Sequence, residues 1–296
     1  MAISPQLAFY QQRLMSLKRS RHLDWPAHVH LETFARCNAR CDFCPSSTLE
    51  RSGVRMPDAL IEKIIRELEE MPRDLPFQLS PFKVNEPFLD RRLLDVLHRI
   101  NDRLPQAEIT LTTNASPLTR NQLLQLGRVK NLGYLWISLN EYRPELYERV
   151  MGLDFGKVVE RLDLVHAMLG SRELTFRVVV SRVADGSEED EAFSRWVQGR
   201  WPGFQVSLFQ RGGWLGQVNV ATGAVPDVGC LRWFDLSITA TGVVAHCCMD
   251  GTAAHPIGDV NHQHVLEVYD ASAYRVLRMR MESRLTVMPC RLCTFL

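Results

Sequence analysis

Cysteine is the residue type in this chain with the most chemistry to offer, and its distribution is uneven. There are eight cysteines, and none lies between Cys44 and Cys230. No secretory signal pattern precedes them, and clustered cysteines in an intracellular protein favour metal or redox chemistry over a disulfide framework. The two groups are Cys37, Cys41 and Cys44, and then Cys230, Cys247, Cys248, Cys290 and Cys293.

The first group is a compact C-x3-C-x2-C run, Cys37-Asn-Ala-Arg-Cys41-Asp-Phe-Cys44. Three thiolates on one short loop can hold three irons of a [4Fe–4S] cube and leave the fourth iron open to a ligand. The alternatives are a zinc site or three incidental cysteines. Three ligands alone would leave a zinc ion with an open position, so the iron–sulfur interpretation is preferred.

This spacing, with Phe43 directly before the third cysteine, resembles the signature of the radical S-adenosylmethionine (SAM) superfamily. In that family the free iron binds the amino and carboxylate groups of SAM. One electron from the cluster then cleaves SAM to a 5′-deoxyadenosyl radical, which takes a hydrogen atom from the substrate. The resemblance therefore implies SAM and one [4Fe–4S] cluster at Cys37, Cys41 and Cys44.

Polar residues after later strands also resemble family elements. Glu86, in Asn85-Glu86-Pro87, matches the acidic residue of a Gly-Gly-Glu-Pro element that meets the SAM amino group, although the glycines are absent here. Thr113 and Asn114 resemble the Thr-Asn-Gly stretch near the ribose. Ser138 and Asn140 resemble a polar pair near the ribose hydroxyls. For each residue the simpler alternative is a solvated loop side chain.

Two arginines are candidates for the SAM carboxylate. Arg177 and Arg182 lie in and after the fifth expected strand. Arginine pairs with a carboxylate through two parallel hydrogen bonds, which is the reason for the assignment.

The second group resembles the auxiliary-cluster module known as SPASM, or Twitch in its shortened form. The match is Cys230-x11-Gly242-x4-Cys247, followed by Cys290-Arg-Leu-Cys293. It implies a second [4Fe–4S] cluster with all four irons held, and a role in moving electrons or supporting the site. Gly242 is expected to make the hairpin turn that brings the first two ligands together. A zinc ion on four thiolates is the rival.

Cys248 is left over from both sets. If Cys247 and Cys248 are adjacent strand residues, they point to opposite faces and do not serve one cluster equally. Cys248 is then either a small packing residue or a hydrogen-atom donor, because a thiol S–H bond is weaker than a carbinol C–H bond. Donation from the face opposite abstraction would invert one stereocentre.

The elements between the two groups alternate strand and helix. Six strands are expected, and they are separated by helices. Parallel strands joined by helices predict an α/β fold, here a partial (β/α)6 TIM-like barrel, since a closed barrel needs eight units. A small α+β Twitch domain with a β-hairpin and a helix is expected to follow. The strand ranges are 28–33, 77–79, 108–113, 134–138, 174–180 and 205–209.

Composition supports this organisation. The expected units are an N-terminal helix in residues 1–27, the barrel in 28–212 and the auxiliary domain in 213–296.

The formal net charge is +1, which argues against a nucleic-acid partner. No stretch is long and apolar enough to span a membrane, so we expect no membrane partner and a cytoplasmic protein. The amphipathic segment Ser4 to Arg21 predicts the first helix, with Leu7, Tyr10, Leu14 and Leu17 on its apolar stripe.

The layout resembles the radical SAM epimerase and dehydrogenase of aminoglycoside antibiotic biosynthesis. Three functions follow from it: an epimerase of a small hydroxylated metabolite such as a sugar or aminoglycoside, with Cys248 as hydrogen donor; a dehydrogenase of a similar substrate; and a peptide-modifying maturase. The epimerase is narrowly preferred. A maturase is disfavoured because only 36 residues precede Cys37, too few for a leader-binding domain. A merely structural zinc protein is the non-enzyme alternative.

The resemblance also implies an electron donor such as flavodoxin or ferredoxin. Five residues near the second group of cysteines are candidates to line the substrate cavity, although surface positions are the more common outcome for His246 and Asp250. The candidates are Arg232, Trp233, Asp235, His246 and Asp250.

Overall fold

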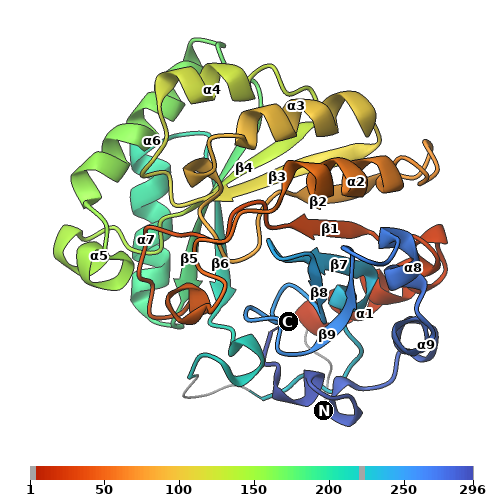
Figure 1. Cartoon of the computed structure of the whole chain (residues 1–296). Helices are drawn as coiled ribbons and strands as arrows, with labels where there is room; N and C mark the ends of the chain where they lie inside the picture. Colours follow the sequence, from red (N-terminus) through yellow and green to blue (C-terminus); the bar gives the residue numbers. More distant parts are fainter. Residues whose placement is uncertain (1–4, 220–223, 296) are drawn as a thin grey trace.

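A single nine-stranded sheet organises the protein in the computed structural model, which describes residues 5–219 and 224–295 (Figure 1). The strand order is β6-β5-β4-β3-β2-β1-β7-β8-β9. The first seven strands of this order run parallel, and β8 and β9 are antiparallel additions. The strands are β1 (His28–Leu31), β2 (Phe77–Ser80), β3 (Ala107–Thr113), β4 (Leu132–Ser138), β5 (Arg177–Ala184), β6 (Gln205–Gln210), β7 (Asp235–Ile238), β8 (Val243–Ala245) and β9 (Pro256–Asp259).

Helices join the six barrel strands and cover the outer face of the sheet (Figure 1). This confirms the α/β class and the partial barrel of six strand–helix units. The helices are α1 (Pro5–Lys18), α2 (Asp58–Leu68), α3 (Leu93–Arg103), α4 (Arg120–Leu126), α5 (Pro144–Met151), α6 (Phe155–Gly170), α7 (Glu188–Arg200), α8 (Val265–Asp270) and α9 (Ser272–Arg280). None of the described helices is long and apolar enough to cross a membrane.

The barrel strands have two different faces. In β3 the residues at alternate positions, Ala107, Ile109 and Leu111, are buried in the main core beneath the helices. Thr110 and Thr112, between them, lie on the opposite face, because side chains in a strand alternate in direction. The barrel interior is therefore lined by the more polar set, and its carboxyl-terminal edge carries the site.

Helix α1 confirms the expected N-terminal helix. Its stripe of Leu7, Tyr10, Leu14 and Leu17 packs in a cluster with Trp233 and with two of the second-group cysteines. The amphipathic pattern thus seats the helix on the auxiliary part of the chain rather than on the barrel core.

The auxiliary part extends the barrel sheet. Strand β7 pairs in parallel with β1, with His28 opposite Asp235, and the β7–β8 hairpin turns at Gly242, whose φ is +86°. The expected hairpin and the helix near 271–281 are present. Strand β9 and helix α8 lie outside the sequence-based expectations. The boundary proposed at 212/213 falls between β6 and β7.

Strand β5 begins three residues later than expected. It runs from Arg177 to Ala184 rather than over 174–180. Leu174 and Phe176 are buried, but they precede the strand. This offset changes the position of both candidate arginines, as described below.

Candidate active site and auxiliary cysteine site

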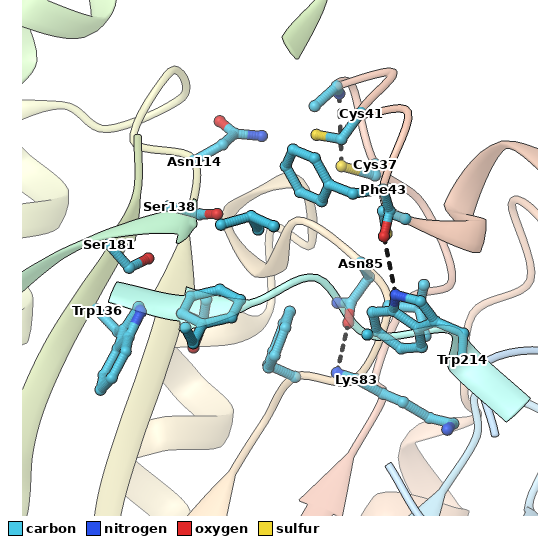
Figure 2. Close-up of a pocket in the computed structure, with 18 of the residues that line it drawn as sticks. Cys37, Cys41, Phe43, Lys83, Asn85, Asn114, Trp136, Ser138, Ser181 and Trp214 are labelled. Carbon is cyan, nitrogen blue, oxygen red and sulfur yellow. Dashed lines mark hydrogen bonds between the residues drawn. The ribbon is translucent and has the colours of Figure 1, made fainter. Parts of the chain in front are cut away.

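An open cavity of about 400 Å³ lies at the carboxyl ends of the barrel strands (Figure 2). Its wall combines residues from the loop after β1, from the ends of β2 to β6, and from the C-terminal part. The lining residues include Cys37, Cys41, Cys44, Glu86, Thr113, Asn114, Trp136, Ser138, Ser181, Ser207, Phe209, Trp214, Arg232, Met249 and Phe295.

The three cysteines of the first group all face this cavity from one loop. All three thiols are free and partly exposed. Backbone groups fix the loop: the amide of Ala39 donates to Cys37 Sγ at 3.4 Å, and the indole of Trp214 donates to the carbonyl oxygen of Phe43 at 2.8 Å. Burial raises the pKa of the Cys37 thiol to about 12, so a bound metal would be needed to stabilise the thiolate.

Glu86 is the only acidic residue among those described as lining the cavity. Its Oε1 accepts hydrogen bonds from the Thr113 hydroxyl (2.8 Å) and the Phe88 amide (3.1 Å), and its Oε2 accepts one from the Asn114 amide (2.7 Å). Burial raises the pKa of Glu86 to about 7, although these three donors oppose the shift. A carboxylate has about four lone-pair sites, so acceptor capacity remains for an ammonium group.

The remaining candidates from strand ends fall into two groups. Thr113, Asn114 and Ser138 line the cavity with Glu86. Asn140 is buried behind it, where its amide donates to Ser138 Oγ at 2.9 Å and its Oδ1 accepts from the Val183 amide at 3.0 Å. Asn140 therefore links the loop after β4 to β5, and its positive φ of 66° suits an asparagine.

The prediction that Arg177 and Arg182 meet the SAM carboxylate gains no support from this geometry. Arg177 stands at the start of β5, the end opposite the cysteine loop, and its guanidinium lies 3.8 Å from the ring centroid of Tyr134. Arg182 is buried and pairs with Asp190 Oδ1 at 2.7 Å and with Asp185 Oδ2 at 3.1 Å. Neither lines the cavity, because β5 starts later than expected and acidic residues near α7 occupy Arg182.

The second cysteine group forms a separate, enclosed site. Cys230, Cys247, Cys290 and Cys293 are all buried, and they line one small cavity of about 10 Å³. Two ring nitrogens approach Cys290 Sγ: Trp233 Nε1 donates at 3.4 Å, and His246 Nε2 lies at 3.2 Å. Four sulfurs with nearby N–H donors are the environment that iron–sulfur clusters use.

Cys248 lies in a turn after β8, not in the strand. The strand-parity argument for separating it from Cys247 therefore does not hold. It is partly exposed, and it is absent from the described lining of either cavity. The amine of Lys83 donates to the Asp250 carbonyl oxygen at 2.8 Å and to that of Cys248 at 3.4 Å, which fixes this turn.

Arg232 connects the two sites. Together with Met249 and Phe295 it lines both the large cavity and the small one. Its pKa is raised mainly by Cys248 and then by Asp235, so the guanidinium stays charged beside the cysteines.

The other four cavity candidates are distributed differently. Trp233 and His246 line only the small cavity. Asp250 is fully buried and accepts hydrogen bonds from the backbone amides of the turn, so it is a structural residue.

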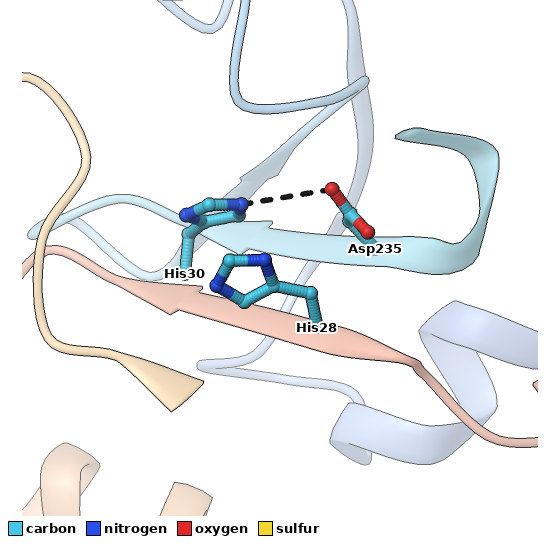
Figure 3. Close-up of side chains that lie close together, drawn as sticks. All are labelled: His28, His30 and Asp235. Atoms are coloured by element: carbon cyan, nitrogen blue, oxygen red, sulfur yellow. Dashed lines mark ion pairs between the residues drawn. The ribbon is translucent and has the colours of Figure 1, made fainter. Parts of the chain in front are cut away.

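Asp235 belongs to a buried polar cluster on β1 and β7. His28 and His30 point to the same side of β1, toward Asp235 on β7 (Figure 3). His30 Nε2 lies 3.6 Å from Asp235 Oδ2, which also accepts from Arg232 Nη1 at 3.2 Å. Burial lowers the pKa of both imidazoles, so they are neutral. The guanidinium already balances the carboxylate, and the cluster therefore orients Arg232 rather than offering an unpaired charge to a cation.

Several lining residues were not identified from the sequence. Trp136, Ser181 and Ser207 line the cavity from the inner faces of β4, β5 and β6. The parity of the strands is the signal that would have found one of them, since Trp136 is two residues before Ser138 and shares its face. Met249 and Phe295 come from the C-terminal part, where no local pattern places them in this cavity.

Comparison with known proteins agrees with this geometry. The radical SAM superfamily model matches residues 31–190, and the iron–sulfur cluster-binding (SPASM) domain matches residues 230–294. The chain belongs to the radical SAM superfamily, with a C-terminal SPASM-type cluster domain.

Relatives of known activity differ in how much of the chain they match. GTP 3′,8-cyclase of Streptomyces coelicolor is 27% identical over 182 residues, 56% of this chain and 51% of the cyclase. The chain thus matches about half the length of that relative. The S-adenosyl-L-methionine-dependent 2-deoxy-scyllo-inosamine dehydrogenase of Niallia circulans is 21% identical over 261 residues, 86% of both chains.

Solved structures show the same fold. BtrN in complex with AdoMet and 2-DOIA superposes with a TM-score of 0.58 at 15% identity, covering 90% of this chain and 92% of BtrN. Streptococcus suis SuiB bound to its precursor peptide SuiA gives 0.68 at 14% identity, covering 99% and 76%.

The family match defines the cofactors: SAM, a [4Fe–4S] cluster and an auxiliary iron–sulfur cluster. The chain fits both clusters, because three free thiols share the open cavity and four buried thiols share the enclosed one.

Proposed function

We propose that this radical SAM enzyme is a dehydrogenase that oxidises a secondary alcohol of a small hydroxylated metabolite. When bound, the cluster at Cys37, Cys41 and Cys44 supplies the electron that splits SAM into methionine and a 5′-deoxyadenosyl radical, which removes a hydrogen atom from the substrate carbon. The carbon radical must then lose its hydroxyl proton and one electron to become a ketone.

One observation carries the proposal: the cavity for SAM and substrate shares Arg232, Met249 and Phe295 with the four-cysteine cavity. A cluster held by the four cysteines of the second site would therefore lie next to the substrate cavity, separated from it by a shared wall. A site with four thiolates has no open iron for a substrate, which leaves electron transfer as its chemical role. The 2-deoxy-scyllo-inosamine dehydrogenase aligns with 86% of this chain and over 86% of its own length, which supports the same assignment.

Arg232 has a defined part in this reaction. Its side chain is 30% exposed, and its hydrogen bond to Asp235 fixes its orientation. A fixed cation at the cavity wall stabilises the developing alkoxide character of the substrate oxygen and favours loss of the hydroxyl proton. Glu86, Thr113 and Asn114 supply the polar edge where the amino group and ribose of SAM would bind.

Epimerisation with Cys248 as hydrogen donor is the second candidate. Cys248 is partly exposed, and its neighbours Cys247 and Met249 line the small cavity and both cavities respectively. A peptide substrate, as in SuiB, has only the shared fold in its favour.

The test is anaerobic turnover in D₂O, with 2-deoxy-scyllo-inosamine as the first probe. Dehydrogenation predicts 5′-deoxyadenosine together with a ketone two mass units lighter than the probe. An epimer carrying one solvent deuterium, lost in Cys248→Ala, would replace the dehydrogenase by the epimerase. If no 5′-deoxyadenosine forms with this or any other hydroxylated probe, both proposals fail.

A further inference from the structure

Exposed apolar side chains are concentrated around the auxiliary cysteine site. Eleven large hydrophobic residues are exposed in the described structure, and seven of them belong to residues 5–21 and 275–293. The most exposed are Phe9 (66%), Met288 (53%), Met279 (49%) and Leu292 (47%). Single exposed apolar residues need no explanation, but a grouping of this kind marks an interaction surface.

The two segments lie over the same buried cluster. Tyr10 and Leu14 of α1 pack with Cys230 and Cys290, and the Arg284 side chain donates to the Tyr10 hydroxyl at 2.8 Å. Cys290 is 4% exposed, yet Met288 and Leu292, two residues away on either side, are about half exposed. A thin layer of side chains therefore separates the auxiliary site from the surface. In Figure 1 the chain after α9 is the darkest blue part and lies at the lower edge of the molecule.

Charge on the two segments is strongly one-sided. They contain nine of the 35 lysines and arginines but only one of the 34 acidic residues, Glu282. The rest of the chain thus has 26 basic and 33 acidic residues, so a basic face stands on an otherwise acidic molecule.

Some of these cations are already paired and some are not. Arg21 and Arg275 pair with acidic neighbours, and Arg278 and Arg284 are buried. Arg280 lies 3.8 Å from Glu282. Among the cations of these segments that the structure describes and that are not buried, four have no carboxylate within ion-pair distance: Arg13, Lys18, Arg19 and Arg291.

We infer that this face, formed by residues 5–21 and 275–293, is the docking site of a small acidic one-electron carrier protein with a flavin or iron–sulfur centre. The inference rests on the proposed function, because each dehydrogenation delivers one electron to the auxiliary site. That electron passes to the oxidised carrier, which is reduced by one electron, while the proton leaves separately. Apolar contacts over a redox centre with a basic rim are complementary to an acidic partner and accelerate encounter.

The experiment measures electron exchange without SAM or substrate, so it is independent of the reaction itself. Photoreduced flavodoxin is mixed anaerobically with the reconstituted full-length enzyme, and the bimolecular rate of cluster reduction is followed. The variant is Arg13→Glu/Arg19→Glu. The matched control is Arg128→Glu/Lys130→Glu, two exposed cations of the α4–β4 connection. Reduction by dithionite is measured for each protein.

The expected rate with flavodoxin falls about tenfold or more in the variant and with added salt, whereas the control variant and all dithionite rates match wild type. A second variant, Met288→Glu, is expected to lower the flavodoxin rate and to alter its salt dependence less than the double variant does, because it adds one negative charge rather than reversing two positive ones. Equal losses in both charge-reversed pairs, or no loss in either, would overturn the inference. If the Arg13→Glu/Arg19→Glu variant contains less iron or is reduced more slowly by dithionite, Met288→Glu decides the test instead. A flavodoxin rate equal to that of wild type in Met288→Glu would also overturn the inference.

Discussion

The two cysteine sites use the same side chain for different purposes, and their geometry explains how. The first takes three partly exposed thiols from one loop at the edge of a cavity of about 400 Å³. The second takes four buried thiols from three separate segments around a cavity of about 10 Å³. A site with a missing ligand and open access can bind and activate a cofactor. A closed site with a full ligand set can only exchange electrons or hold the chain together.

The largest expected effect is on the open site. Cys41→Ala should abolish formation of 5′-deoxyadenosine, because two thiols cannot retain the cluster, and iron should fall from about eight to about four per chain. Chromatography of the adenosine product and an iron assay check both values. Cleavage of SAM above background would contradict the assignment of the first site.

Disrupting the enclosed site should affect the reaction differently from disrupting the open site. Cys293→Ala is expected to lower iron to about four per chain. It should leave dithionite-driven 5′-deoxyadenosine formation in place while product formation stops, since the electron has no acceptor. Cys248→Ala, as the control, should keep its full iron content. If Cys248→Ala lost the auxiliary iron instead, the ligand set would need revision.

Arg182 and Arg177, neither of which lines the cavity, give a matched pair of stability predictions. Arg182→Ala should lower the free energy of unfolding by about 3–5 kcal/mol, because it strands buried Asp190. Arg177→Ala removes an exposed contact and should cost under about 1 kcal/mol. Urea denaturation measures both. A normal stability for Arg182→Ala with weakened SAM binding would restore its expected role.

The raised pKa of Glu86 predicts that SAM binding at the open site depends on pH. Its raised pKa of about 7 means that the carboxyl is largely neutral at pH 6 and ionised at pH 8. Only the ionised form attracts an ammonium group, so SAM affinity should rise with pH across this interval. In Glu86→Gln the affinity should be about 10–100-fold weaker, the loss expected for a charged hydrogen bond, and independent of pH there. Calorimetric titration at several pH values provides the measurement.

The raised pKa of Glu86 has the opposite effect on folding stability, whose contribution from this residue decreases as pH rises. Burial penalises the ionised carboxylate, so without SAM the contribution of Glu86 to stability is most favourable below its ordinary pKa. That contribution is lost as pH rises toward about 7. Equal thermal stability of wild type and Glu86→Gln across this range would contradict the burial effect.

A small effect is expected at Gly242, in the β7–β8 hairpin turn that precedes Cys247. Gly242 has a φ of +86°, and a Cβ there would lie 2.3 Å from Asn261 Nδ2. Gly242→Ala should therefore cost about 1–2 kcal/mol, which thermal denaturation can detect. An unchanged melting temperature would mean that Asn261 moves aside freely.

The sequence predicts the open site better than the rest, for a physical reason. Its three ligands lie on one short loop, so their spacing alone determines that they meet. Cys230, Cys290 and Cys293 meet only after the chain has folded, and the resemblance to a known module was needed to group them. Glu86 was found through the same resemblance.

The errors arose where tertiary contacts decide. The β-branched run that suggested a strand from residue 174 starts too early, and Arg182 turned to the acidic residues near α7. Cys248 was assigned to a strand that ends at Ala245, so its parity carried no information. Arg232 could be suspected from its nearness to Cys230, but its position between two cavities depends on packing that no local pattern encodes.

The pairing of β7 with β1 has a mechanical consequence. Backbone hydrogen bonds join the first strand of the barrel to the auxiliary hairpin, so the loop after β1 with its three cysteines and the hairpin that precedes Cys247 extend from one continuous sheet. Swinging the auxiliary part away from the barrel as a separate body would therefore require breaking this strand pairing.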